Sequence, residues 1–417
     1  MSLRPAFLSR RRLVVGALLG SVILAGCGGK GSSANAPTGG ITVTPGDTQV
    51  TITWQQDAGV EYWLWYAPGS TINPSESNTP GIRYHINIGS PYIVTGLTNG
   101  TQYAFALNGR INGGKGGDYA YGTTTPRLAG TTWTAVTNLT ADMRGLAYGT
   151  TSTVTTATYV AAGTAGAAFS STDGHTWTAL ANPAGTANVN AMTVGLSTFI
   201  AVGDGGAIYY STDLSTWTQA TSNTTNKLTA VATSGGVAVA VGENGTIRYS
   251  TSAGTWTAAA SVPSGIGHLY GISYTPSGLW IAVGAGGVVL TSSDGTNWTQ
   301  RTSGTAATLY GVSGMATTSG STTTYTYVAT GTGGQVLTSS DGTTWTASTV
   351  SPAVTLYSVI GSNQFVAVGA NGAAFTSPDG VTWTYYAASS GNDLYTLMKA
   401  ANQYIGVGAN KAMAYSQ

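Results

Sequence analysis

Short runs of alternating apolar and polar side chains fill the segment 41–126. The strongest runs are 50–54 (V-T-I-T-W), 62–66 (Y-W-L-W-Y) and 103–107 (Y-A-F-A-L), and Gly, Asn or Asp residues separate them. Alternation with a period of two predicts strands that bury one face. Weaker runs lie at 41–44, 84–88, 92–94 and 119–121. Seven short strands in one segment of this length predict a small β-sandwich.

The rest of the chain repeats one pattern of strands and turns. A tryptophan followed by threonine returns every 38 to 47 residues, at Trp133, Trp177, Trp217, Trp256, Trp298, Trp345 and Trp383. A period of about 40 residues is that of a four-stranded propeller blade. The repeat therefore predicts a second all-β domain over 129–417.

The same short turn precedes most of these tryptophans. It reads S-T-D-G at 171–174 and S-S-D-G at 292–295, and its acidic residues are Asp173, Asp213, Asp294, Asp341 and Asp379. An Asp in such a turn accepts backbone N–H groups, and a Gly takes the left-handed position. We therefore expect these aspartates to be structural and the tryptophans to be buried between sheets. A second repeated turn, V-G-x-x-G, is expected to join the second and third strands of each repeat.

The repeat begins and ends at complementary points. Trp133 has no preceding turn, and the last repeat, 404–416, ends before its tryptophan. The fragment 132–136 is therefore expected to supply the outer strand of the last blade. This pairing gives seven blades and removes the exposed edges of an open array.

Two of these patterns resemble known families. The run 94–103, with Leu97 and Tyr103, resembles the E–F corner of fibronectin type III domains, and Trp54 falls where that family places its core tryptophan. The repeats resemble the Asp-box (BNR) repeats of sialidase-like propellers. In spacing they are closer to the photosystem II stability/assembly factor-like propellers. The resemblances imply a fibronectin type III-like domain at 41–126 and a seven-bladed β-propeller, but they carry no single function.

The N-terminus has the organisation of an export signal. A basic stretch, 1–12, precedes 13 apolar residues, which suit a signal peptide and are too few for a comfortable transmembrane helix. The sequence L-A-G-C that follows resembles the lipobox of bacterial lipoproteins. That resemblance implies a signal peptide at 1–26, a lipidated Cys27, a flexible tether at 27–40, and a place in the cell envelope, in the outer membrane and periplasm or at the cell surface. The motif S-R-R-R-L-V leaves general and twin-arginine export both open.

Composition and charge exclude several classes of protein. Charged residues are only 7% of the chain, while 42% is hydrophobic and Gly numbers 60, which suits short strands and tight turns rather than disorder. Loss of the signal peptide removes four of the 15 basic residues and leaves 11 against 14 acidic ones, a net charge of −3. A nucleic-acid partner is therefore not expected.

The repeats hold few residues for catalysis. A sialidase needs a cluster of arginines, but only Arg144, Arg248 and Arg301 occur here. Asp204 and Glu243 occupy equivalent turns of neighbouring repeats, and they are the one pair of carboxylates placed to act as in a glycosidase. Three scattered histidines and a single cysteine predict no metal site, and no cofactor is expected. We therefore expect a protein that is not an enzyme.

Tyrosines at the start of the inner strands are better candidates for binding. Tyr270, Tyr310, Tyr357 and Tyr395 occupy one position in four consecutive repeats, and Arg144, Asn190 and Thr229 occupy it in the first three. Four such side chains would form an arc at one mouth of the central channel. Aromatic faces with hydroxyl tips suit peptide segments or sugar rings. The alternative is that the tyrosines only pack between blades.

Together these features predict a non-catalytic envelope lipoprotein whose propeller binds another macromolecule. A protein partner, in an assembly or scaffold role, is the first expectation. The alternatives are a surface protein that binds polysaccharide and a glycoside hydrolase of the sialidase-like type. The lipid on Cys27 would be the contact with the membrane.

Overall fold

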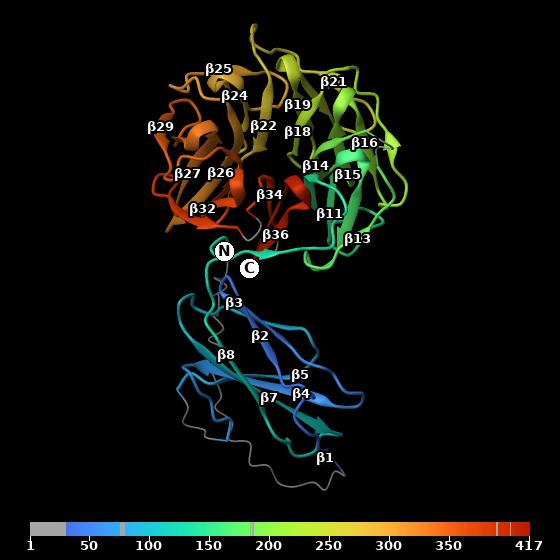
Figure 1. Cartoon of the computed structure of the whole chain (residues 1–417), viewed down its shortest axis with the longest axis vertical. Helices are drawn as coiled ribbons and strands as arrows, with labels where there is room; N and C mark the ends of the chain where they lie inside the picture. Colours follow the sequence, from blue (N-terminus) through green and yellow to red (C-terminus); the bar gives the residue numbers. More distant parts are fainter. Residues whose placement is uncertain (1–30, 76–79, 184, 186, 389–390, 401) are drawn as a thin grey trace, which may run out of the picture.

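The computed structural model describes residues 31–417 except 76–79, 184, 186, 389–390 and 401. The expected signal peptide and Cys27 lie outside the described residues. In the described part of the chain, no helix is long and apolar enough to cross a bilayer. Figure 1 shows two β-rich units, a smaller N-terminal one and a ring of sheets.

The N-terminal unit is two packed sheets. One contains β2 (Thr42–Gly46), β3 (Gln49–Thr53) and β6 (Tyr92–Thr95). The other contains β5 (Arg83–Ile88), β4 (Glu61–Pro68), β7 (Tyr103–Ile111), β8 (Ala120–Thr124) and β1 (Ser32–Ser33). Val50, Ile52, Tyr62, Leu64 and Phe105 are buried between the sheets because alternate residues of each strand face inward. Strand β1 lies within the expected flexible tether, and its two residues instead pair with Arg110 and Ile111.

A side-chain contact holds the corner between β6 and β7. The backbone N–H of Thr98 donates to the Tyr103 hydroxyl at 3.2 Å, and Leu97 is buried in the core beside Trp54. The corner therefore fixes the turn between β6 and β7.

The ring consists of seven four-stranded antiparallel sheets among the described residues, numbered here from sheet 1 to sheet 7 along the chain. Sheets 1 to 3 contain β10 (Met143–Gly149), β11 (Thr158–Gly163), β12 (Ala168–Ser171), β13 (Thr178–Ala179); β14 (Val189–Gly195), β15 (Thr198–Gly203), β16 (Ile208–Ser211), β17 (Thr218–Gln219); and β18 (Leu228–Thr233), β19 (Ala238–Gly242), β20 (Ile247–Ser250), β21 (Thr257–Ala258).

Sheets 4 to 6 contain β22 (Leu269–Tyr274), β23 (Trp280–Gly284), β24 (Val289–Ser292), β25 (Thr299–Arg301); β26 (Leu309–Ser319), β27 (Thr322–Gly331), β28 (Gln335–Ser339), β29 (Thr346–Thr349); and β30 (Leu356–Gly361), β31 (Phe365–Gly369), β32 (Ala373–Ser377), β33 (Thr384–Ala387). Sheet 7 contains β34 (Leu394–Ala400), β35 (Gln403–Gly408), β36 (Met413–Ser416) and β9 (Thr134–Ala135). The core lies between adjacent sheets, where the second strands are almost wholly buried.

A 3-10 turn follows the second strand of every sheet. These turns are η1 (Thr164–Gly166), η2 (Asp204–Gly206), η3 (Glu243–Gly245), η4 (Ala285–Gly287), η5 (Thr332–Gly334), η6 (Ala370–Gly372) and η7 (Ala409–Lys411). The glycine before each turn is needed for a close approach. A Cβ at Gly203, for example, would lie 2.1 Å from the carbonyl oxygen of Asn188 in the same sheet. The V-G-x-x-G repeat is therefore explained by packing within the sheet.

The two ends of the ring close on each other. Ala135 pairs with Ala414 and Thr134 pairs with Tyr415, so β9 is the outer strand of sheet 7 as expected. The repeated turn, which the sequence does not show before Trp133, is nevertheless present. Two separate segments of the chain form it together. Ser416 Oγ accepts the N–H of Gly130 at 2.7 Å, and the Trp133 indole donates to the Gly130 carbonyl at 3.0 Å. The repeated turn is therefore completed by residues from both ends of the chain.

Candidate functional site

The inner strand of every sheet carries a β-bulge at its second residue. In each strand the pairing register shifts between the first and the third residue. A bulge leaves one residue out of the ladder and redirects its side chain. The seven residues at this position are Arg144, Asn190, Thr229, Tyr270, Tyr310, Tyr357 and Tyr395.

All seven bulge residues line a cavity of about 760 Å³ in the central channel. They lie where the inner strands begin, at the end of the ring that also carries the 3-10 turns. We call this end the channel mouth. The N-terminal unit contacts the opposite end of the ring, because Asn363 and Asn402, which bond to it, lie in the hairpins between the first and second strands. The channel mouth is therefore left open by the N-terminal unit.

Tyr270, Tyr310, Tyr357 and Tyr395 form a continuous tyrosine arc. The centroids of successive rings are 5.2, 5.4 and 5.4 Å apart, with interplanar angles of 49°, 64° and 72°. Edge-to-face pairs at this distance attract each other through their quadrupoles. Each ring is half-buried, so the arc supports itself and still presents aromatic surface to the channel.

Arg144 continues the arc on one side. Its guanidinium carbon lies 6.0 Å from the centroid of the Tyr395 ring, which is the outer limit of a cation–π contact. The Arg144 Nε has no hydrogen-bond partner among the described residues. The guanidinium therefore brings a positive charge to the edge of an aromatic surface, while its Nε is buried.

The other two bulge residues fix neighbouring sheets. Asn190 donates to the Leu228 carbonyl at 2.9 Å, and the Thr229 hydroxyl donates to the Leu269 carbonyl at 2.6 Å. Both acceptors belong to the inner strand of the next sheet. The same position therefore holds sheets together on one side of the mouth and presents aromatic rings on the other.

Burial, and then the charge of the neighbouring Asp393 carboxylate, raise the pKa of Tyr357 to about 12. The Tyr357 hydroxyl donates to Asp393 Oδ2 at 3.4 Å. Burial, and then the neighbouring Tyr270, raise the pKa of Tyr310. Tyr310 and Tyr357 therefore stay neutral at physiological pH, and their hydroxyls act as hydrogen-bond groups.

Asp204 and Glu243 occupy equivalent turns, but their side chains have different surroundings. Burial works to raise the pKa of Asp204, but hydrogen bonds from Asn190 and Asn188 and the charge of Lys227 outweigh it and leave the pKa below its usual value. Both amides donate at 2.9 Å, and the Lys227 ammonium is 3.4 Å away. Asp204 is therefore held ionised between sheets 2 and 3. Glu243 lines the channel cavity.

The remaining acids of the ring, Asp142 and Asp393, join neighbouring sheets. Asp393 Oδ1 accepts the N–H of Asn371 at 2.9 Å, and Asp142 Oδ1 accepts the N–H of Lys411 at 2.8 Å. Asn188 and His268 occupy the equivalent position and make the same kind of bond. The sequence signal for this role is a polar residue directly before an inner strand, which the repeated turns alone do not reveal.

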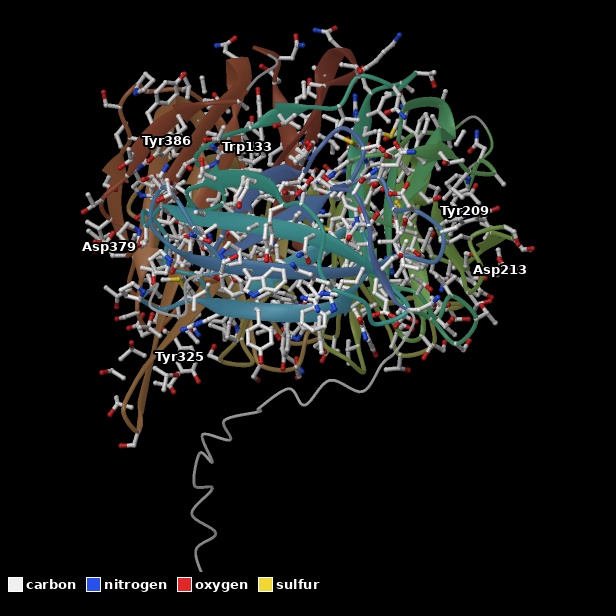
Figure 2. The ribbon with its side chains drawn as sticks, turned by 90° about the horizontal axis from the view of Figure 1, so that it is seen from below. Trp133, Tyr209, Asp213, Tyr325, Asp379 and Tyr386 are labelled. Carbon is white, nitrogen blue, oxygen red and sulfur yellow. The ribbon has the colours of Figure 1, made fainter. Side chains whose placement is uncertain are left out.

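The acids of the repeated turns have structural partners. Asp173, Asp213, Asp294, Asp341 and Asp379 each accept the two backbone N–H groups two and three residues further on, at 2.7 to 2.9 Å. Figure 2 shows Asp213 and Asp379 at opposite edges of the molecule.

The tryptophans of the repeat close the same turns. Their indoles donate to the residue at the glycine position at 2.8 to 3.2 Å, in Trp177, Trp256, Trp298, Trp345 and Trp383. Trp217 lacks this bond: Leu214 stands in place of glycine in its turn, and the buried Trp217 Nε1 has no partner among the described residues.

Neither a protein-family model nor a curated protein matches the sequence. Solved structures do match. YCF48 bound to a D1 peptide aligns at 18% identity and a TM-score of 0.53, over 68% of this chain and 96% of its own. The ring is a β-propeller. YCF48 from Cyanidioschyzon merolae (18% identity, TM-score 0.52, 69% and 98% covered) and the WD40 propeller of Doa1 (8%, 0.52, 69% and 97%) support the same fold.

Proposed function

We propose that this chain is a non-catalytic lipoprotein of the cell envelope that binds another protein at the channel mouth of its propeller. In this proposal the propeller has seven blades, the N-terminal unit is a fibronectin type III-like module, and a lipid on Cys27 holds both at a membrane. The observation that carries the proposal is the tyrosine arc, which is raised on bulges around an open cavity beside the unpaired Arg144.

The chemistry of the arc suits a protein segment. Tyrosine and arginine are enriched at the centres of protein interfaces, where they combine apolar area with hydrogen-bond donors. The cavity of about 760 Å³ is of the size that takes a small ligand or a short extended segment. A propeller of similar fold, YCF48, is known in complex with a D1 peptide, so this architecture accommodates a peptide ligand.

A binding role also agrees with the state of the acidic residues. A glycosidase needs one carboxyl group that is protonated near neutral pH, so its pKa must be raised. The pKa of Asp204 is shifted downward instead, and its carboxylate oxygens already bind Asn188, Asn190 and Lys227. We therefore propose that Asp204 stabilises the structure of the channel mouth and takes no part in catalysis.

Crosslinking and pull-down of the full lipoprotein in cells tests the proposal, with recovered material analysed for proteins and for glycans. The double variant Tyr310→Ala/Tyr357→Ala removes the centre of the arc, and Tyr310→Phe/Tyr357→Phe keeps its rings. Tyr385→Ala is a matched control, because Tyr385 is exposed on β33 away from the channel. We expect one protein to be recovered in near-stoichiometric amount and lost only in the alanine double variant. Recovery of polysaccharide in its place would contradict a protein partner.

A further inference from the structure

An aromatic stripe crosses the outer face of the N-terminal five-stranded sheet. Tyr84 of β5 pairs with Trp65 of β4, Trp65 pairs with Ala106 of β7, and Ala106 pairs with Tyr121 of β8. Directly paired residues point to the same side of a sheet. Their neighbours Tyr62, Leu64 and Phe105 fill the core, so this row faces outward.

Tyr119 fills the gap in the row that Ala106 leaves. Its ring lies 5.5 Å from the Trp65 ring, edge-on, and 5.9 Å from the Tyr121 ring. Tyr84, Trp65, Tyr119 and Tyr121 therefore form the stripe. Tyr84 and Tyr121 are 63% and 57% exposed, so its two ends are free in this chain.

The next row adds apolar area and donors. Ile86 pairs with Trp63, whose ring lies 6.0 Å from the Trp65 ring, and the Arg110 guanidinium stacks on Trp63 at 3.6 Å. The Arg110 Nε is buried and finds no acceptor among the described residues, so a hydrogen bond to a ligand has to come from the terminal Nη groups. A stacked guanidinium keeps its N–H groups in the plane of the fork, where they can meet a ligand oxygen.

The dimensions of the stripe favour a narrow, linear ligand. Three strand spacings give a length of about 14 Å, and two rows give a width of about 7 Å. The patch is therefore a few hundred Å² at most, against about 800 Å² per partner in a stable protein interface. A second copy of the chain or a folded partner needs more surface than this.

The shape beside the stripe disfavours a membrane. Ile72 and Ile82, which follow β4 in the chain, lie over the same face of the sheet, where Ile72 packs on Ala67, Ala104 and Ala106 with Trp65 and Tyr119 beside them. A sheet face flanked by a loop is recessed, whereas residues that enter a bilayer have to reach about 5–10 Å into it. Arg110 is the one cation among the residues named in the two rows, whereas recognition of anionic headgroups uses clusters of basic residues.

We propose that this stripe binds a β-1,4-linked polysaccharide chain. Such a chain is straight and ribbon-like, and the C–H faces of its sugar rings stack on aromatic rings while its hydroxyls reach water or the Arg110 N–H groups. The stripe lies on a different domain from the tyrosine arc, so this site is separate from the proposed protein site. The chain would then hold a glycan with one domain and a protein with the other.

The test uses the exported chain from residue 28, without lipid, on three probes: hydroxyethyl cellulose in native affinity gels, chitin beads and purified peptidoglycan sacculi. We expect retention on at least one probe. Tyr84→Ala and Tyr121→Ala should each weaken retention about tenfold, while Tyr385→Ala, on the propeller, leaves it unchanged. Trp65→Ala should abolish retention, and circular dichroism checks that this less exposed site still folds.

The controls separate this site from its alternatives. Tyr310→Ala/Tyr357→Ala should retain the glycan, so loss of retention there would move the glycan site to the propeller and overturn the proposal. No retention on any of the three probes would also overturn it. Flotation with lipid vesicles, or a dimer in solution that Tyr84→Ala dissociates, would assign the stripe to a membrane or to a second copy instead.

Discussion

Asp142 and Lys411 are 269 positions apart in the chain, yet a carboxylate oxygen of Asp142 accepts the backbone N–H of Lys411 at 2.8 Å. This bond joins the first sheet of the propeller to the last, beside the strand pair β36–β9. Asp142→Ala should lower the free energy of unfolding by about 1 kcal/mol, because the N–H loses its acceptor. Asp142→Asn keeps an acceptor and should lose less. Urea unfolding measures both, and equal stability of the two variants would contradict this role.

The repeated turns predict a loss of stability in acid. Hydrogen bonds from the N–H groups of Thr344 and Thr343 hold the pKa of Asp341 at about 2, and those of Thr216 and Ser215 do the same for Asp213. The unfolded value is about 3.9. Because the folded pKa is the lower one, this stability is present above pH 4 and is lost as the pH falls from about 4 to 2.

Urea unfolding at a series of pH values measures this effect. The variant Asp341→Asn keeps an acceptor without a titrating group, so its stability should fall less steeply between pH 4 and pH 2 than that of the wild type. If stability fell with pH as steeply in this variant as in the wild type, the turn would not favour the ionised carboxylate over its protonated form.

The N-terminal module is attached to the propeller by side-chain amides. Asp47 Oδ2 accepts the Asn363 Nδ2–H at 2.9 Å, Lys399 donates to the Oδ1 of the same amide at 2.8 Å, and Asn402 donates to Gln49. Asn363→Ala/Asn402→Ala should free the module and increase the radius of gyration in small-angle scattering. The thermal midpoint of the propeller should hardly change. Thr323→Ala, in the exposed hairpin between β26 and β27, is the control, and an unchanged scattering profile in the double variant would show that other contacts fix the module.

The Tyr357–Asp393 contact can be tested by titration. Burial, and then the Asp393 charge, raise the pKa of Tyr357 to about 12. Asp393→Asn removes the charge and should lower this pKa, so that the hydroxyl ionises nearer to 10. NMR of tyrosine labelled at Cζ follows the single residue, with Tyr357→Phe used for its assignment. An unchanged pKa in Asp393→Asn would show that the carboxylate does not act on the ring.

The sequence was sufficient for features that repeat. The tryptophans recur once per sheet and the S-x-D-G turn recurs in four of the sheets, so their spacing predicts four-stranded sheets, and the incomplete repeats at Trp133 and Ser416 predict the pairing of β9 with β36. The common position of the four tyrosines was also visible. That each occupies a bulge was not, because a bulge depends on the register with the next strand.

Features made by contacts between repeats were less visible. Asp204 and Glu243 occupy equivalent turns of neighbouring repeats. Only Asp204 receives a hydrogen bond from Asn188 and an ion pair from Lys227, which lie at the starts of two neighbouring sheets. The run Y-W-L-W-Y at 62–66 predicts a strand with aromatic residues on both faces. Whether the outer face is open depends on where Ile72 and Ile82 pack, and their positions in the sequence do not reveal that.

A photo-crosslinking amino acid placed at single positions tests the central claim most directly. Incorporated at Tyr310 in the full-length chain in cells, it should give a discrete crosslinked band that contains a second protein, and so should incorporation at Tyr395. Incorporation at Tyr385, on the outer strand of sheet 6, should give none. Crosslinks of equal yield from Tyr385, or no protein adduct from the arc, would contradict a protein-binding channel mouth.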